Sequence, residues 1–321
     1  MRPARVARKA SSTEALAHLS LECRPWAQAD IPTRIDYIRR DRFIEHAGVR
    51  PVKARLVGLL HRPRTVRPQC VLLASEAGSG KTAFLRHLQR LYPDRQERRG
   101  ARIARPVIYT EVEPAPTLRG LQLSLLTELG APPVAIRERE ARNDLIKRYL
   151  SEFATELVLF DEVQHLQAIT RRARMLLLDW MKWVSTGGKV SVVLSAAIAD
   201  GARLIEHDAQ LLTRFTQLRI PRFSVGLPLG QFLLTLERSL PLRRTSGLAH
   251  ESMQRAILDE TEAMQTLRGL TDGVVKVVQE AAVAAVTGGT ERIERPLLNA
   301  WHELGVLPAD SWRPAAARVS V

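Results

Sequence analysis

A glycine-rich stretch near residue 80 carries the strongest chemical signal in the sequence. Its positions are Ser75, Glu76, Ala77, Gly78, Ser79, Gly80, Lys81 and Thr82. It follows the apolar run 71–74 and opens a helix-like run, so backbone N–H groups of the turn would point at a phosphate. Lys81 would reach the β- and γ-oxygens and the Thr82 hydroxyl would bind Mg²⁺. We therefore predict an ATP-binding P-loop, in which Ser75 replaces the first glycine of the usual pattern.

Two acids further along the chain, Asp161 and Glu162, give a second signal. They directly follow the strand-like run 156–160. In a parallel sheet, ligands bind at the carboxyl ends of the strands. Asp161 is expected to hold Mg²⁺ through water, and Glu162 to polarise the attacking water as general base. The alternative is a pair of acids at a helix N-terminus, placed there for the helix dipole, and the upstream P-loop favours catalysis.

Short apolar runs alternate with longer amphipathic ones over residues 70–220. Strands are predicted at 70–74, 107–110, 157–160, 190–194 and 218–220, and helices at 82–91, 117–129, 139–153, 172–185 and within 199–215. This alternation predicts an α/β fold with a doubly wound, parallel five-stranded sheet. Ser195 follows the fourth strand, where a polar sensor would orient water against the γ-phosphate, although a serine at a strand end is common.

The sequence after Pro221 predicts helices alone. These cover 231–239, 250–261, 272–286 and 295–304, which indicates a small helical lid. Two further helices are expected within 33–47 and 52–60. The predicted division is a flexible basic arm over 1–32, a nucleotide-binding domain over 33–225, the lid over 226–307 and a loose tail over 308–321.

The chain is strongly basic. It has 48 Lys and Arg against 34 Asp and Glu, a net charge of +14 and a pI near 10.7. Such a charge suits nucleic acid, because each neutralised phosphate releases a counterion, although a solvated basic surface is the alternative. No apolar run is long enough to span a bilayer, so we predict a cytoplasmic protein without membrane contact. The two cysteines are expected to be reduced.

Read together, these features resemble the TniB/TnsC family, the AAA+ target-selection ATPases of transposons, and more distantly the phage Mu B protein. The resembling segments are RIDYIR (34–39), DRFI (41–44), PVIY (106–109), DEVQHL (161–166), residues 208–215 and LPLRRTSGL (240–248). The resemblance implies an AAA+ P-loop NTPase using ATP and Mg²⁺. It also implies a homo-oligomeric ring or helical filament on double-stranded DNA, with a transposase and a target-selector protein as partners.

The resemblance also assigns roles to two basic residues, Arg214 and Lys276. Arg214 stands just before the last strand, where AAA+ proteins commonly present an arginine finger to the neighbouring subunit; its alternative role is a partner for the helix dipole. Lys276 stands where AAA+ lids carry a cation, usually arginine, that touches the γ-phosphate, with surface charge as the alternative. Ser75, Lys276 and the segment 196–198 depart from the family pattern and put the hydrolysis rate in question.

Candidate DNA contacts lie in loops at the edge of the predicted sheet. They are Arg119, Arg137 and Arg139, with the basic loop 95–105 in reserve. Few aromatic residues are nearby, which favours contact with the phosphate backbone over base stacking. Two other functions stay open: a helicase-loader ATPase acting on single-stranded DNA, and a nucleotide-gated scaffold whose charge is incidental.

Overall fold

The computed structural model describes residues 16–63, 65–96, 103–131, 138–198, 214–264 and 268–304. The chain divides into two compact units. One is the continuous stretch Ala47–Pro221, and the other combines Met1–His46 with Arg222–Val321. Each unit has its own hydrophobic core, so each is considered by itself.

A parallel five-stranded sheet forms the centre of the Ala47–Pro221 unit, as predicted. Its strands are β1 (Cys70–Ser75), β4 (Val107–Glu111), β5 (Leu157–Asp161), β6 (Ser191–Ala197) and β7 (Phe215–Leu218). Their order is β4-β5-β6-β1-β7, and every neighbouring pair is parallel. β1 and β5 are buried along their whole length, as expected of strands covered on both faces.

The fifth strand lies earlier in the chain than the predicted 218–220. β7 begins at Phe215, opposite Cys70, and ends at Leu218, opposite Leu73. Phe215 belongs to the hydrophobic core, so burying its ring sets the start of the strand. Ile220 comes after the strand, and its N–H donates to the hydroxyl of Ser75 over 2.7 Å.

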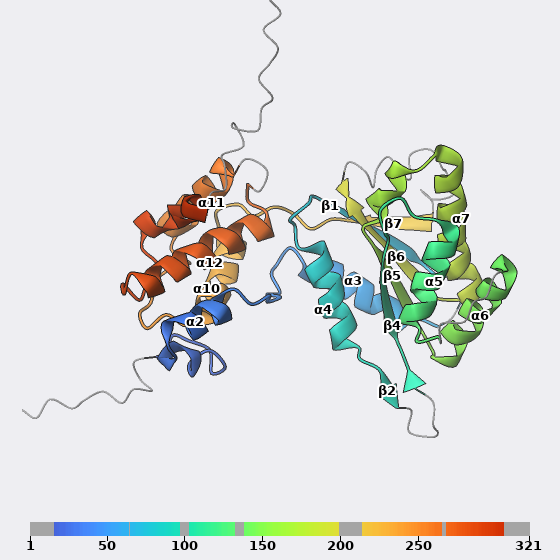
Figure 1. The fold of residues 1–321 in the computed structure, drawn as a ribbon, viewed down its shortest axis with the longest axis horizontal. Helices are drawn as coiled ribbons and strands as arrows, with labels where there is room; N and C mark the ends of the chain where they lie inside the picture. The colour runs from blue at the N-terminus through green and yellow to red at the C-terminus, as the bar shows by residue number, and fades with distance from the viewer. Residues whose placement is uncertain are drawn as a thin grey trace, which may run out of the picture. The chain divides into compact units, whose positions relative to one another are not determined.

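Helices cover both faces of this sheet (Figure 1). α3 (Arg50–Leu60) and α4 (Lys81–Leu91) lie on one side, and α5 (Leu118–Glu128), α6 (Arg139–Glu152) and α7 (Arg171–Gly188) lie on the other. α5 and α7 begin after Thr117 and Thr170, whose hydroxyl oxygens accept N–H groups of the first turn. The helices predicted within 199–215 fall almost wholly outside the described residues. In the basic loop 95–105, β2 (Arg95–Gln96) pairs antiparallel with β3 (Ile103–Ala104).

The other unit is helical. It contains the 3-10 turn η1 (Trp26–Gln28), α2 (Ile31–Ile38), α10 (Leu227–Arg238), α11 (Glu251–Ala263), α12 (Thr271–Thr287) and the 3-10 segment η3 (Arg295–Leu304). The helices predicted after Pro221 are therefore present, the last one with 3-10 geometry. Among the described residues of both units, we find no helix with the length and apolar character needed to cross a membrane.

The N-terminal segment differs from its predicted organisation. α2 ends at Ile38 instead of continuing toward residue 47, and Ile38 joins the core of the helical unit. Within the arm predicted as flexible, Leu16, Leu19 and Cys23 are buried in a small cluster, against which Tyr37 of α2 packs. The division at residue 33 therefore differs from that of the structure, in which residues up to 46 belong with the helical unit.

A buried arginine fastens α2 to this helical unit. Arg34 is 1% exposed, and its guanidinium donates to the carbonyl oxygen of Pro241 and to both carboxylate oxygens of Glu291. Arg243 also lies within 3.6 Å of Glu291. A buried guanidinium requires such partners, which explains why the RIDYIR segment packs where it does.

Candidate nucleotide-binding site

The glycine-rich turn has the backbone geometry of a phosphate cradle. Gly78 and Gly80 have φ of 76° and 85°, a backbone conformation that residues with a side chain rarely adopt. Gly80 is the N-cap of α4, so the turn delivers the chain directly into a helix N-terminus. Backbone N–H groups and the positive end of the helix dipole therefore face the same space, which suits an anion.

Lys81 is the first residue of α4 and is folded back onto the turn. Its ammonium donates to the carbonyl oxygens of Ser75 and Glu76, both over 2.9 Å. Burial lowers the pKa of Lys81, and the charges of Asp161, Glu162 and Glu76 act in the opposite direction. A phosphate would compete with two neutral carbonyl groups for this ammonium. Thr82, next along the helix, is exposed, which leaves its hydroxyl accessible to a ligand.

The serine that departs from the P-loop pattern has a structural partner. Ser75 is fully buried at the end of β1, and its hydroxyl oxygen accepts the N–H of Ile220. Next to it, Glu76 lies 3.6 Å from Arg219. A glycine at position 75 would leave the N–H of Ile220 without this acceptor, so the serine joins the start of the turn to the segment after β7.

Asp161 closes β5 and is completely buried. Its Oδ1 accepts the backbone N–H of Glu162 over 3.0 Å, and its Oδ2 accepts the hydroxyl of Tyr109 over 3.0 Å. Burial raises the pKa of Tyr109, as does the adjacent Asp161 charge, so this phenol stays a donor. Both carboxylate oxygens of Asp161 are thus held in a defined orientation by hydrogen bonds.

Tyr109 is a site residue that sequence reasoning did not identify. The PVIY segment was noted only as part of a resemblance. The usable signal was its place on β4, the strand beside β5, where Tyr109 is in register with Leu159. The guanidinium of Arg86 also stacks over its ring, 3.9 Å from the centroid.

Glu162 follows Asp161 with a φ of 57°, an unusual value for a residue that is not glycine. Its carboxylate accepts a hydrogen bond from the side-chain amide of Gln164. Gln164 is a second residue whose contact the sequence did not reveal, because hydrogen bonding within a 3-10 turn leaves no periodic pattern. The turn is η2 (Val163–Ala168), so the acids precede a 3-10 turn and no α-helix begins there.

Ser195 lies on β6, and Leu194 before it pairs with Phe160, the residue before Asp161. Ser195 is therefore level with Asp161 on the neighbouring strand. It is fully buried, and within the described part of the chain its hydroxyl oxygen has no hydrogen-bond partner. A buried hydroxyl in this condition is suited to a water or ligand at the edge of the sheet.

Arg214 lies at the opposite end of the sheet. It directly precedes Phe215, which pairs with the first residue of β1, whereas the P-loop follows the last residue of that strand. The six residues of β1 between these two points span roughly 17 Å. Arg214 is therefore not part of the P-loop site of its own chain.

The candidate DNA-contact residues are partly brought together. Arg119 and Arg139 are exposed near the N-termini of α5 and α6. Gln122, one turn after Arg119, donates its side-chain amide to the carbonyl oxygen of Arg139 over 3.5 Å. Arg137 lies outside the described residues. Lys276, on α12, is half exposed and 2.9 Å from Asp272.

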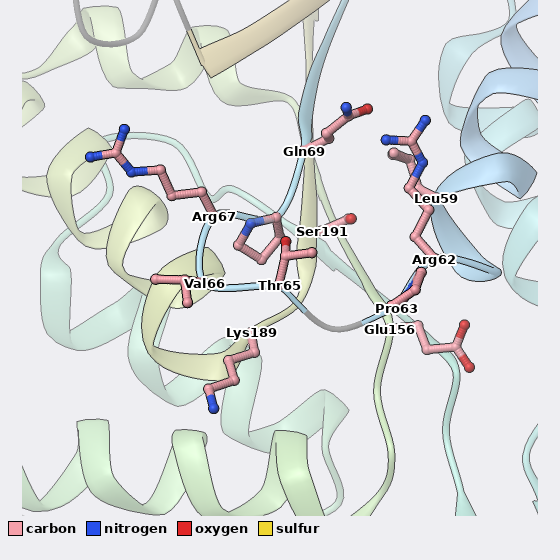
Figure 2. A pocket seen from close by; sticks show the side chains of 11 residues that line it. Leu59, Arg62, Pro63, Thr65, Val66, Arg67, Gln69, Glu156, Lys189 and Ser191 are labelled. Carbon is pink, nitrogen blue, oxygen red and sulfur yellow. The ribbon is translucent and has the colours of Figure 1, made fainter.

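A separate hollow of about 730 Å³ lies at the amino-terminal edge of the sheet (Figure 2). Its charged lining residues are Arg62, Arg67, Glu156 and Lys189. Ser191 begins β6 and Glu156 directly precedes β5, so this hollow lies at the other end of the sheet from Ser75 and Asp161. The nucleotide site and this hollow are therefore distinct.

Comparison with known proteins establishes the family. The sequence matches the family described as bacterial TniB protein over residues 34–225, more than half of the chain. The chain belongs to the TniB family. A search among curated proteins found no match for this TniB-family chain.

Solved structures show the same fold. Cdc6p from Pyrobaculum aerophilum is 17% identical, with a TM-score of 0.58 over 80% of this chain and 67% of that one. The ORC2 protein of Aeropyrum pernix, in ADPNP-ADP complexes, is 15% identical, with a TM-score of 0.56 over 84% and 74%. A chain of Drosophila ORC bound to DNA is 16% identical, with a TM-score of 0.52 over 95% and 70%.

These similarities confirm the AAA+ P-loop fold of the TniB-family chain. In the strand order, β1, which leads into the P-loop, lies between β7 and β6, the strand that carries Ser195. Family membership, the built P-loop and the acids at the adjacent strand end together identify the chain as an ATPase.

Proposed function

We propose that this ATPase is a DNA-binding regulator of transposition. In this proposal it oligomerises on double-stranded target DNA when ATP is bound and recruits or activates the transposase at the insertion site. A target-selector protein of the same transposon would direct it. The observation that carries the proposal is a TniB-family chain in which Lys81 of the glycine-rich turn and Asp161 lie at the same edge of one sheet, in a protein with a net charge of +14.

The site residues fit hydrolysis of ATP with Mg²⁺. The Thr82 hydroxyl and the Asp161 carboxylate supply the oxygen ligands or water contacts that Mg²⁺ prefers. Bound there, Mg²⁺ would neutralise charge on the β- and γ-phosphates. Lys81 exchanges its two carbonyl partners for phosphate oxygens, Glu162 takes the proton of the attacking water, and Ser195 orients that water. Lys276 is the lid cation assigned to the γ-phosphate.

The position of Arg214 supports a role for it between neighbouring copies of the chain. Because it lies beyond β7 from the P-loop of its own chain, we assign it to the nucleotide of a neighbouring copy. Its Nε and Nη2 are buried without hydrogen-bond partners among the described residues, so the side chain would have to change rotamer to reach a neighbouring nucleotide. An arginine supplied in trans stabilises charge on the transferring phosphoryl group, so hydrolysis would depend on oligomerisation.

DNA contact is assigned to Arg119 and Arg139, with Arg137 as a further candidate. The two described arginines are exposed on adjacent helix starts, where the helix dipoles also favour phosphate. The chain of Drosophila ORC that shares this fold was solved bound to DNA, which supports a DNA role for the fold here.

Electron microscopy tests the proposal directly. Purified protein is incubated with duplex DNA and either ATP, a non-hydrolysable analogue or ADP, and in parallel with single-stranded DNA. ATP-dependent rings or filaments on duplex DNA are expected, and adding transposase should enrich it at those assemblies. Absence of assembly on duplex DNA would overturn the proposal, and a preference for single strands would favour a helicase-loader function.

A further inference from the structure

We infer that Gln164 is a positioning residue for the carboxylate of Glu162, tying it to the end of the sensor strand β6. The inference deepens the proposed function, since it rests on Glu162 being the general base. Gln164 carries no role in the reaction described so far, yet it contacts two elements of the site at once.

The side-chain amide of Gln164 has two partners. Its Nε2 donates to Oε2 of Glu162, and its Oε1 accepts the backbone N–H of Ala197 over 3.3 Å. A carboxylate only accepts and a backbone N–H only donates, so the amide satisfies both partners in one orientation alone. Gln164 is therefore a bridge of defined direction between the turn after β5 and the end of β6.

The backbone of the turn supports the same placement. Glu162 adopts a left-handed conformation, with φ 57° and ψ 33°, which a non-glycine residue holds only where the surroundings impose it. Its carbonyl oxygen accepts the N–H of His165 over 3.0 Å. The ring nitrogen Nδ1 of His165 in turn lies 2.6 Å from the carbonyl oxygen of Val112, just beyond β4. The turn is thus fastened on both sides, and Gln164 supplies its link to β6.

A general base acts only when it is held within hydrogen-bonding reach of the proton that it removes. The amide of Gln164 occupies Oε2 of Glu162 and leaves Oε1 for a water. It also connects that carboxylate to the strand that carries Ser195, two residues before Ala197. The two groups assigned to the attacking water are therefore linked through Gln164. Because the amide is neutral, it orients the carboxylate without adding a counter-charge beside Lys81.

Three variants test the bridge: Gln164→Ala removes it, Gln164→Met keeps most of its bulk, and Gln164→Glu places a second carboxylate against Glu162. Steady-state ATPase rates on duplex DNA, ADP binding and thermal unfolding are measured for each. We expect kcat to fall about tenfold in the Ala and Met variants, with KM for ATP and ADP affinity unchanged. Gln164→Glu should fall further, because like charges repel. Gln217→Ala, at an exposed glutamine of the same unit, is the control and should match the parent protein.

An unchanged or increased kcat in Gln164→Met would overturn the inference, as would a parallel loss of ADP affinity and thermal stability in that variant. Glu162→Gln separates this inference from the proposed function on which it rests. If Glu162→Gln keeps full turnover, the base assignment itself is wrong. If Glu162→Gln is inactive while both Gln164→Ala and Gln164→Met turn over normally, only the bridge is refuted.

Discussion

The hydroxyl of Tyr109 on β4 donates to Oδ2 of Asp161 on β5 over 3.0 Å. The two residues come from neighbouring parallel strands, and both are buried. One oxygen of the acid assigned to Mg²⁺ is therefore oriented by a side chain outside the usual nucleotide motifs. Removing the hydroxyl group of Tyr109 tests the importance of this contact.

Tyr109→Phe is expected to raise the Mg²⁺ concentration that gives half-maximal ATPase rate. Loss of the hydrogen bond costs about 1 kcal/mol, equivalent to roughly fivefold in that concentration. Titration of ATPase activity with Mg²⁺ measures the shift. Tyr149→Phe, whose ring packs on Phe153 in the same unit, should leave the curve in place. Identical titrations for both variants would contradict an orienting role for Tyr109.

Lys81→Ala is expected to abolish nucleotide binding. The ammonium of Lys81 is buried against the P-loop, where it is placed to contact the β- and γ-phosphates. Equilibrium binding of a fluorescent ATP analogue measures the loss. Lys147→Ala, at an exposed lysine on α6, serves as the matched control. Parental affinity in Lys81→Ala would remove the nucleotide site from this turn.

Glu162→Gln is expected to bind ATP but to hydrolyse it at least about a hundredfold more slowly, because the amide cannot take a proton from water. Assemblies formed on duplex DNA with ATP should then persist. Their lifetime is followed by light scattering after dilution. Faster disassembly than in the parent protein would remove Glu162 from the base role.

Arg119→Glu and Arg139→Glu are expected to weaken binding to duplex DNA across all sequences. Removing one phosphate contact should reduce the slope of log K against log salt by about 1. Fluorescence anisotropy at several salt concentrations provides the slope. Arg238→Glu, at an exposed arginine of the helical unit, makes the same change in net charge. Equal slopes for all three variants would show that charge alone, and not position, governs the binding.

Glu291→Gln is expected to destabilise the helical unit at neutral pH by about 3 kcal/mol, because it leaves the buried Arg34 without its anionic partner. Burial opposes the charged form of Glu291, but the contacts with Arg34 and Arg243 outweigh it and lower its pKa. A lowered folded-state pKa contributes stability above the unfolded value of about 4.3, and this contribution is lost as pH falls through the folded-state pKa.

Denaturant unfolding at pH values from about 3 to about 7 measures this dependence, because carboxylates titrate within roughly that range. The parent protein should lose stability on acidification more steeply than Glu291→Gln. Glu251→Gln breaks an exposed ion pair with Arg255 and should follow the parent curve. Parallel acid limbs in the parent protein and Glu291→Gln would contradict the assignment.

The local patterns predicted much of this fold. The strand, turn and helix around Gly78 and Gly80 were predictable because apolar runs and glycines act over short distances. Asp161 and Glu162 were predictable because acids at the end of an apolar strand are unusual. The last strand was misplaced because an apolar residue such as Ile220 can follow a strand as easily as extend it.

Contacts between distant parts of the chain were not predictable in this way. The packing of α2 with the helical unit depends on Arg34 and Glu291, which are far apart in the sequence, and no periodicity connects them. The same is true of Tyr109, whose role requires the neighbouring strand to be known. The contacts of Gln164 could not be predicted either, because they depend on the geometry of a 3-10 turn, which hydrophobic patterns do not encode.

The hydrogen bond between the Ser75 hydroxyl and the N–H of Ile220 bears on how this protein should be engineered. A design that follows consensus would restore glycine at position 75, and such a change is usually regarded as repair. Here it would release the segment that follows β7 and add backbone freedom where the P-loop begins. The serine at position 75 is therefore better kept in any engineered variant, because it is part of the packing of this particular fold.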